Sequence, residues 1–477
     1  MRNLSICAVL LVAGCSLQPV YEQPALPVAP AFPAGPAYKP VSGAEAAAVD
    51  IGWRDFLTDP RLQRLVEIAL KNNRDLRVAA LNIAGAQAQY RIQRADLFPA
   101  VNAAASSTGQ RNSVAGRGIT THTYSADIGA SWTIDFFGRL RSLTDQTLQQ
   151  YFATAQAGKA TDLLLVSQVA DQYLTVLAAD ELLEVTRATL ETAKQSYDLA
   201  QVQFEAGTGT ELSVRQAQTV VEQANANYAA QLRARAQAEN QLVVLIGEPL
   251  PADLPPQVPL NSQRLLADVP AGLPSDLLTR RPDIMEGEAN LRAAYASIGA
   301  ARAAFFPTIS LTGTLGSQSL ELSSLFKAGT GMWSFIPSIT MPIFQGGALQ
   351  ASLDAAKIQK ETAVAQYEKT IQTAFREVAD GLAARGTYDD QIAALERDVE
   401  AQQSSLELSE LRYRTGVDSY LNVLTAQDNL YTAEQLLVAA RLNRLTSLVD
   451  LYRALGGGWI ERTGDPPRPA EDLALNR

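Results

Sequence analysis

Few residues of this 477-residue chain belong to a type and spacing that would carry out catalysis or bind a metal. His122 is the single histidine, and four methionines are too few for a methionine-rich metal site. The glycines at 456–458 have no lysine after them, so they end a helix and do not form a phosphate-binding loop. Aspartates and glutamates are scattered at helix-surface spacing, with no isolated pair suited to acid–base catalysis. The sequence therefore predicts no catalytic residue, no metal site, no cofactor and no enzyme.

The chemistry that the sequence does predict is lipid attachment at Cys15. An apolar run at 4–12 follows a positive charge and is too short to span a bilayer, which needs about 20 residues. It ends in the sequence LVAGC at 11–15, which resembles a bacterial lipobox, where cleavage precedes a cysteine that then carries the lipid. Ser16, in place of aspartate, indicates sorting to the outer membrane. The alternative is an ordinary cleaved signal peptide beside an unrelated cysteine.

Composition excludes other classes of protein. The chain is 47% hydrophobic and 19% charged, which argues against disorder. Its net charge of -10 argues against nucleic acid as a partner, because phosphate binding favours a basic surface. No later stretch is apolar for long enough to form a transmembrane helix. If the chain crosses a membrane, we expect it to do so as strands.

A long internal repeat divides the chain into two halves in which the same predicted elements recur. Residues 75–99 match 283–307 without a gap, and further along the offset grows by one, so that 169–171 match 378–380. A period this long indicates a duplicated half and not a solenoid. Each half reads as helix, strand pair, very long helix, tight turn and helix. The predicted ranges are 60–98, 100–136, 139–206 and 211–246 in the first half, and 281–306, 308–344, 347–414 and 418–455 in the second.

The long helices and the strand pairs need different kinds of neighbour. A helix over 139–206 would be roughly 100 Å long and needs lateral partners along its length, as in coiled coils. The strand segments alternate, with apolar residues at even positions of 124–136 and at odd positions of 333–343. One face then suits lipid and the other water, although a soluble half-buried sheet is the alternative. Four strands cannot close a barrel, and bacterial barrels begin at eight, so three chains would supply twelve strands.

These features predict a division of the chain into six parts. They are a signal peptide at 1–14, a lipidated proline-rich tether at 15–50, a first repeat at 51–250, a linker at 251–275, a second repeat at 276–458 and a C-terminal tail at 459–477.

Several motifs resemble one known family over nearly the whole chain from Cys15 to Trp459. Besides the lipobox and the tether, they are GWRDF at 52–56, NNRDLR at 72–77, YRIQRAD at 90–96, RRPDI at 280–284, IGAARAAFFP at 298–307 and ALGGGW at 454–459. The chain is similar to the TolC-type outer-membrane efflux channels, and within them to the OprM branch.

The resemblance implies a mainly α fold with a β-barrel. Long coiled-coil-like helices and four transmembrane strands per chain would form a homotrimer, with a 12-stranded barrel in outer-membrane lipid and an α-helical barrel in the periplasm. Such channels are passive, gated exit ducts of tripartite pumps. A periplasmic adaptor (membrane fusion protein) joins them to an inner-membrane transporter of the resistance-nodulation-division (RND) class.

The resemblance also assigns roles to the two tight turns. They would form the periplasmic tip where the adaptor docks, at Gly207, Thr208, Gly416 and Val417. The local reason for glycine at 207 and 416 is a helix C-cap. The alternative is that the turns are structural only.

Side-chain contacts between neighbouring helices and chains hold the tip closed in this family. The matching positions here are Asp380, Arg385, Tyr413 and Leu421. Asp380 and Arg385 would pair with charges across the pore, although they would serve equally to solvate a helix face. Thr425 stands where an acidic residue is expected, and Asp428 stands where a basic one is expected, so the details of the gate differ from those of its relatives.

The residues leave several cargoes open. Multidrug efflux is the leading expectation, and outlets for copper or silver efflux and for type I protein secretion share the architecture. A periplasmic adaptor also has long helical hairpins, but it lacks paired strand sets and a duplication of this length. The acidic composition suggests a duct that favours cations.

Overall fold

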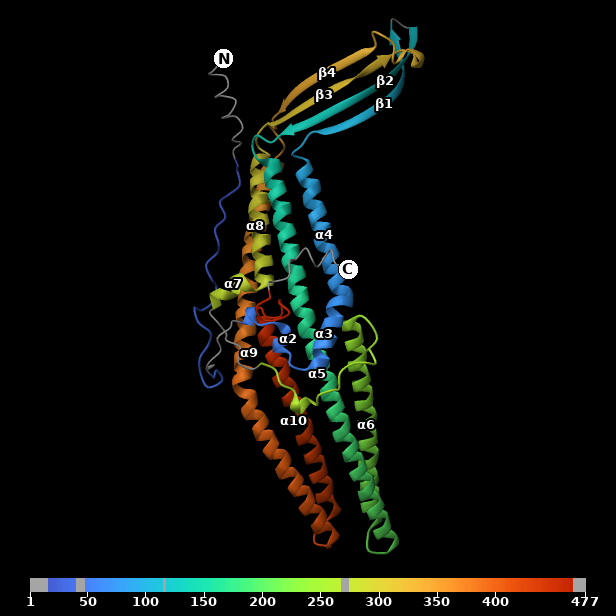
Figure 1. The fold of residues 1–477 in the computed structure, drawn as a ribbon, viewed down its shortest axis with the longest axis vertical. Coiled ribbons are helices and arrows are strands. Elements are labelled where there is room, and N and C mark those ends of the chain that lie inside the picture. The colour runs from blue at the N-terminus through green and yellow to red at the C-terminus, as the bar shows by residue number, and fades with distance from the viewer. Residues whose placement is uncertain (1–15, 40–47, 115–116, 267–273, 466–477) are drawn as a thin grey trace. The chain divides into compact units, whose positions relative to one another are not determined.

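The structure, a computed structural model, describes residues 16–39, 48–114, 117–266 and 274–465. Cys15, the signal peptide and parts of the tether, the linker and the tail lie outside these residues. Figure 1 shows the order of the elements. The main helices and strands are α2 (Trp53–Phe56), α3 (Pro60–Asn72), α4 (Arg74–Ala95), β1 (Ala100–Val114), β2 (Arg117–Ile134), α5 (Arg139–Glu205), α6 (Glu211–Ile246), α7 (Leu277–Arg280), α8 (Pro282–Ala303), β3 (Thr308–Ser319), β4 (Gly331–Thr340), α9 (Ala348–Arg414) and α10 (Tyr420–Ala454).

The duplication predicted from the sequence is confirmed by the element order. Helices α5 and α9 both have 67 residues, and α6 and α10 have 36 and 35. The equivalent glycines at the ends of α6 and α10, Gly247 and Gly456, both have a positive φ. At 1.5 Å per residue, α5 and α9 are each roughly 100 Å long, as their unbroken helix-forming composition predicts.

Two compact units divide the chain, and they cut across the two repeats. Unit 1 contains 1–25, 82–155 and 286–369, and therefore holds all four strands. Unit 2 contains 26–81, 156–285 and 370–477, and holds α6, α10 and most of α5 and α9. Each repeat thus contributes strands to one unit and helices to the other. None of the described helices combines the length and the apolar composition needed to span a membrane.

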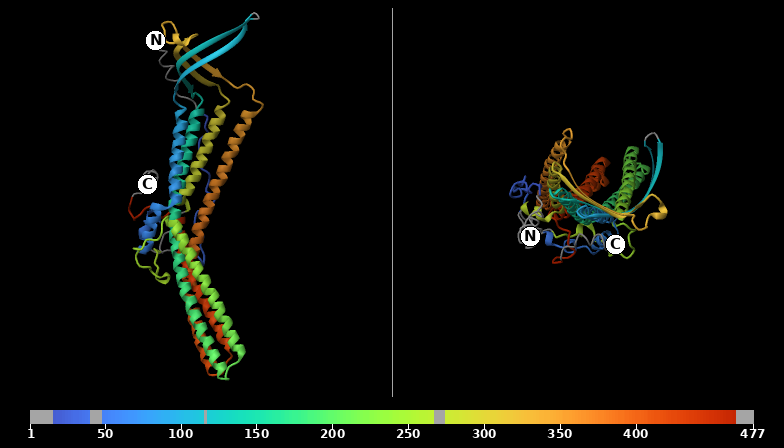
Figure 2. Two further views of the ribbon diagram at one scale, coloured as in Figure 1. Left: turned by 90° about the vertical axis from the view of Figure 1, so that its right-hand side faces the viewer. Right: turned by 90° about the horizontal axis from the view of Figure 1, so that it is seen from above.

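The strands of both repeats form one antiparallel sheet in the order β1-β2-β3-β4, which Figure 2 shows as a single curved layer. The pairing of β2 with β3 joins the two halves, with Ile128 opposite Leu315, and Leu315 lies opposite Trp333 of β4. These three side chains are exposed on one face, whereas Thr314 and Ser334 bond each other at 2.6 Å on the other. The predicted alternation of apolar and polar faces is confirmed.

β4 is shorter than the predicted segment, because it ends at Thr340. Pro342 follows two residues later and has no backbone N–H for a sheet ladder. Pro337 lies inside β4, which is an edge strand of the sheet, the position where proline is tolerated.

The single helix predicted over 60–98 is wrong, because Asn73 divides it. Asn73 has an extended backbone and ends α3. Its side-chain oxygen then accepts a hydrogen bond from the Leu76 amide at 3.0 Å, which caps α4, and its side-chain nitrogen donates to the Leu245 carbonyl at 2.8 Å. Helix α3 begins in the same way, because buried Asp59 caps it through the Arg61 amide at 2.8 Å.

Candidate functional site

The two turns that end the helix pairs have the same backbone geometry. Gly207 and Gly416 have φ angles of 75° and 74°, the left-handed region that favours glycine. The Thr208 amide donates to the Gln203 carbonyl at 2.9 Å, and the Val417 amide donates to the Arg412 carbonyl at the same distance. These bonds satisfy the last carbonyls of α5 and α9. The predicted C-cap explanation for both glycines is therefore confirmed, whereas adaptor docking at these turns stays a prediction.

Different interactions close the two turns. Thr210 caps α6 by accepting a hydrogen bond from the Ser213 amide at 3.1 Å. Before α10, Asp418 instead forms an ion pair with Arg412. The hydrogen bond from this guanidinium lowers the pKa of the Asp418 carboxyl. The second turn therefore carries a charge pair, whereas a neutral hydroxyl caps the helix after the first.

Exposed apolar side chains accompany both turns. Phe204 and Leu212 flank the first turn, and Val417 and Leu421 belong to the second. Their exposed fractions range from 46% to 67%. Apolar side chains gathered at an exposed end are typical of a surface that contacts another protein.

Tyr413 links the two helix pairs near these turns. Its hydroxyl, on α9, donates to the side-chain oxygen of Gln203 on α5 at 2.6 Å. Its ring lies 5.1 Å from that of Tyr420 on α10, and burial raises the pKa of Tyr413. Around them the helices share an apolar core that includes Ala200, Ala217 and Val423.

Further polar contacts continue along α5 from this point. Gln427 donates to the Ser196 hydroxyl at 3.2 Å, and Tyr431 and Thr186 bond each other at 3.1 Å in a buried position. Local sequence patterns do not identify Gln203, Ser196 or Thr186 as partners. The repeated Ala-Gln pair at 217–218 and 426–427 marks Gln427 but not the residue it contacts.

The other gate candidates lie apart from Tyr413 in one chain. Asp380 pairs with Arg376 of its own helix at 3.6 Å, and both side chains are 68% exposed. Arg385 donates to the backbone carbonyl of Lys39 at 3.3 Å. Both positions are roughly 40 Å or more along α9 from Tyr413. One chain therefore brings Tyr413 and Leu421 to the same end and leaves Asp380 and Arg385 elsewhere.

Thr425 and Asp428, where the sequence departs from the expected pattern, are both exposed on α10. The Thr425 hydroxyl donates to the Leu421 carbonyl one turn earlier, at 3.0 Å.

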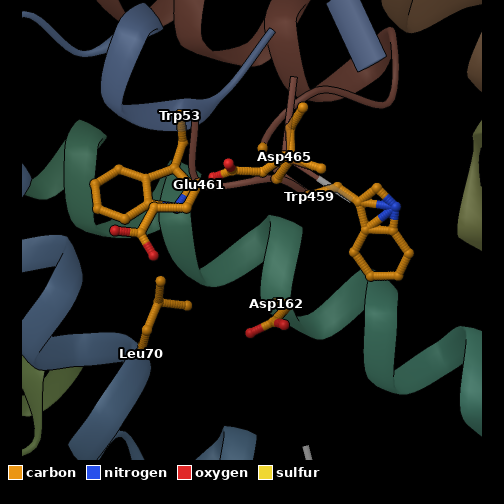
Figure 3. Close-up of a pocket in the computed structure, with 8 residues that line it drawn as sticks. Trp53, Leu70, Asp162, Trp459, Glu461 and Asp465 are labelled. Atoms are coloured by element: carbon orange, nitrogen blue, oxygen red, sulfur yellow. The ribbon is translucent and has the colours of Figure 1, made fainter. Parts of the chain in front are cut away.

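A pocket of about 260 Å³ in unit 2 contains two indoles and several carboxylates (Figure 3). Its lining includes Trp53, Leu70, Asp162, Trp459, Glu461 and Asp465. The chain itself supplies cations here, because Arg54 lies 4.6 Å from the Trp53 ring centre and bonds Glu461 at 2.6 Å. Lys159 lies 4.5 Å from the Trp459 ring centre. We therefore interpret this pocket as the junction of residues 51–56 with the C-terminal segment. Over the described residues, no group of three or more potential ligand side chains gathers to hold a metal.

Comparison with known proteins places these features in one family. The sequence profile described as outer membrane efflux protein matches residues 65–248 and 273–457. The chain is 51% identical over 475 residues to the probable efflux pump outer membrane protein TtgC of Pseudomonas putida, covering 98% of both chains. It is 44% identical over 458 residues to the outer membrane protein OprJ of Pseudomonas aeruginosa, covering 95% of both.

Solved structures agree with this. The open state of the MtrE outer membrane channel of Neisseria gonorrhoeae matches with a TM-score of 0.83 and 40% identity, over 94% of this chain and 100% of that one. A CusC structure matches with a TM-score of 0.81 and 41% identity, over 93% and 100%. The predicted efflux-channel fold, the outer-membrane location and the non-enzymatic nature of the protein are thereby confirmed. The chain belongs to the outer membrane efflux protein family and is an efflux channel of the bacterial outer membrane.

Proposed function

We propose that three copies of this chain form the gated, passive exit duct of a tripartite multidrug efflux pump. One observation supports this most strongly: the sheet has two free edges, β1 and β4, and carries exposed Ile128, Leu315 and Trp333 on one face. An open edge is costly in lipid, because its N–H and C=O groups find no partners there. Pairing β4 of one copy with β1 of the next removes every edge and yields twelve strands in a trimer.

The pump partners and the cargo follow by analogy with the relatives. Proteins named as antibiotic and toluene efflux pump outer membrane proteins are 51% identical to this chain. We infer that a periplasmic adaptor docks at the turns around Gly207, Thr208, Gly416 and Val417, and that an RND transporter supplies the energy. We infer that drugs and apolar solvents leave through the duct.

We assign the gate to two positions along the helices, one at the end near the turns and one further along α9. Tyr413 and Leu421 would close the end, and Asp380 and Arg385 would act further along α9. A closed end that opens on adaptor binding is a two-state element, so weakening a closed-state contact raises the open population.

The N-terminal assignments complete the proposal. We infer a signal peptide at 1–14 and a lipid on Cys15, followed by the tether, the two repeats, the linker and the tail at the predicted boundaries. Leu17 supports the lipid site, because its carbonyl accepts from Arg302 at 3.2 Å, near the start of β3.

A deletion strain tests the cargo. Removal of the gene should cause hypersensitivity to unrelated antibiotics, dyes, detergents and toluene, and a plasmid copy should restore resistance. Sensitivity to copper or silver alone would assign the duct to metal efflux, and loss of an exported protein with normal drug resistance would assign it to secretion.

A further inference from the structure

The segment Ser16–Lys39, which the sequence predicts to be a spacer, is bound to the helices, and we refer to it as the strap. In Figure 1 it is the dark-blue chain beside α8 and α9. In unit 1, the Tyr21 hydroxyl donates to Glu288 at 3.1 Å. The Tyr21 ring lies edge-on to Tyr295 at 5.5 Å and under the Arg292 guanidinium at 4.6 Å. These contacts hold the first part of the strap on α8.

The second part of the strap is held on α9 within unit 2. Phe32 stacks on Phe375 with ring centres 5.2 Å apart. Lys39 then makes two contacts, because its ammonium bonds Asp390 at 2.7 Å and its carbonyl accepts from Arg385 at 3.3 Å. Arg385, a gate candidate, is therefore in direct contact with the strap.

At two glycines inside helices, the strap passes close to the helix backbone. A Cβ added to Gly386 of α9 would overlap the Ala37 carbonyl oxygen. One added to Gly299 of α8 would lie 2.7 Å from Ser142 Oγ and 2.9 Å from Gln18 Cα. Glycine inside a helix destabilises it relative to alanine. A glycine at 386 is thus explained by the close approach of the strap.

We propose that the strap restrains α9 at Arg385, Gly386 and Asp390 and thereby favours the arrangement of α9 on which it is docked. The inference rests on the proposed function as a gated channel. A movement of this part of α9 during opening must either carry the strap along or break the bonds to Lys39. The strap binds one arrangement of α9 better than others, so its binding shifts the population toward that arrangement.

Gly386→Ala is the variant that tests the restraint, because it removes space for the strap while favouring the helix. Gly85→Ala, in α4, is the matched control, since an added Cβ there meets no described atom within 4 Å. Lys39→Glu is a second variant, which replaces the ion pair with Asp390 by like charges on an exposed surface. Proteinase K cleavage of the strap, trimer melting temperature and single-channel conductance are measured on purified full-length protein in lipid bilayers.

Gly386→Ala and Lys39→Glu should both be cleaved faster in the strap and should change the open probability in the same direction, by about three- to tenfold, with unchanged trimer melting. Gly85→Ala should behave as wild type. Faster cleavage with unchanged open probability would overturn the restraint, and so would a strap that stays protected in both variants. Loss of trimers in both variants would overturn it in favour of a folding role. Absence of conductance from the wild type would contradict the proposed function itself, whereas the cleavage result would still report whether the strap is docked.

Discussion

At the scale of single residues, Tyr413 is the proposed gate residue with the most specific contact. Its hydroxyl donates to the side-chain oxygen of Gln203 in the other helix pair. A neutral hydrogen bond of this kind contributes about 0.5–1.5 kcal/mol. If it forms in the closed state alone, its loss changes the open population by up to roughly tenfold.

Tyr413→Phe should therefore raise single-channel open probability and leakage of a large antibiotic that the outer membrane normally excludes. The ring remains, so the contact with Tyr420 is kept. Gln203→Leu should have the same effect, and the double variant should leak no more than either single one. Additive effects of the two substitutions would show that this bond is not the closing contact.

Asp171 and Asp380 occupy equivalent positions of the two repeats but have different surroundings. Asp380 is 68% exposed, whereas Asp171 Oδ1 is buried and has no hydrogen-bond partner among the described residues. Burial, and then the nearby charge of Asp450, raise the pKa of Asp171 to about 7, partly opposed by Arg453. The folded state therefore binds more protons than the unfolded state between about pH 4 and pH 7, and stability falls as the pH rises through that window.

Asp171→Asn should remove the free-energy cost of burying the ionised Asp171 carboxylate. Its stabilising effect should grow from about pH 4 to pH 7 and then stay constant, reaching up to roughly 4 kcal/mol. Melting temperatures measured by circular dichroism from pH 4 to pH 8 give the comparison. Asp380→Asn is the matched control and should show no such growth. An Asp171→Asn curve parallel to wild type would disprove the buried, raised-pKa assignment.

At the scale of elements, the β2–β3 pairing joins the two repeats and depends on Gly316. A Cβ at this position would lie 2.6 Å from the Asp127 Cα atom and would overlap the Ala126 carbonyl. At Gly313 of the same strand, the nearest atom would be 3.7 Å away, an ordinary contact.

Gly316→Ala should therefore destabilise the protein by more than about 2 kcal/mol, because a strand backbone must move. The amount of trimer in the outer membrane should fall severely. Gly313→Ala should be tolerated. Quantitative blotting of outer-membrane fractions measures both. Equal amounts of the two variants would mean that the sheet adapts and that this close approach is unimportant.

Much of the element layout could be predicted from the sequence, because long helix-forming runs and strict alternation are local signals. The bounds of α5 and α9 came from such runs, and the apolar row through Ile128 came from the alternation. The break at Asn73 was missed because its cause is a bond to Leu245, which is distant in sequence. The strap was missed because a proline-rich composition predicts an extended backbone but not the helix that Tyr21 and Phe32 contact. The contacts of Tyr413 and Gln427 depend on how the two repeats pack against each other, which the periodicity of the sequence does not predict.

At the scale of the whole molecule, the long helices and the open sheet both need neighbouring elements. Helices of roughly 100 Å need neighbours along their whole length, and a sheet with free edges needs closure. The proposed ring of three copies would supply both at once. The exposed gate candidates Asp380 and Leu421 would then face other copies.

Closure between copies is the central claim, and cross-linking of the two sheet edges tests it most directly. β1 and β4 are opposite edges within one chain, so a disulfide between them forms between copies. A cysteine replaces Ala104, and a series of second cysteines replaces single residues from Trp333 to Thr340. Oxidation in intact outer membranes should give covalent trimers for positions in register and dimers on partial reaction. Monomers at every position of the series, with the protein present in the membrane, would contradict the closed trimer.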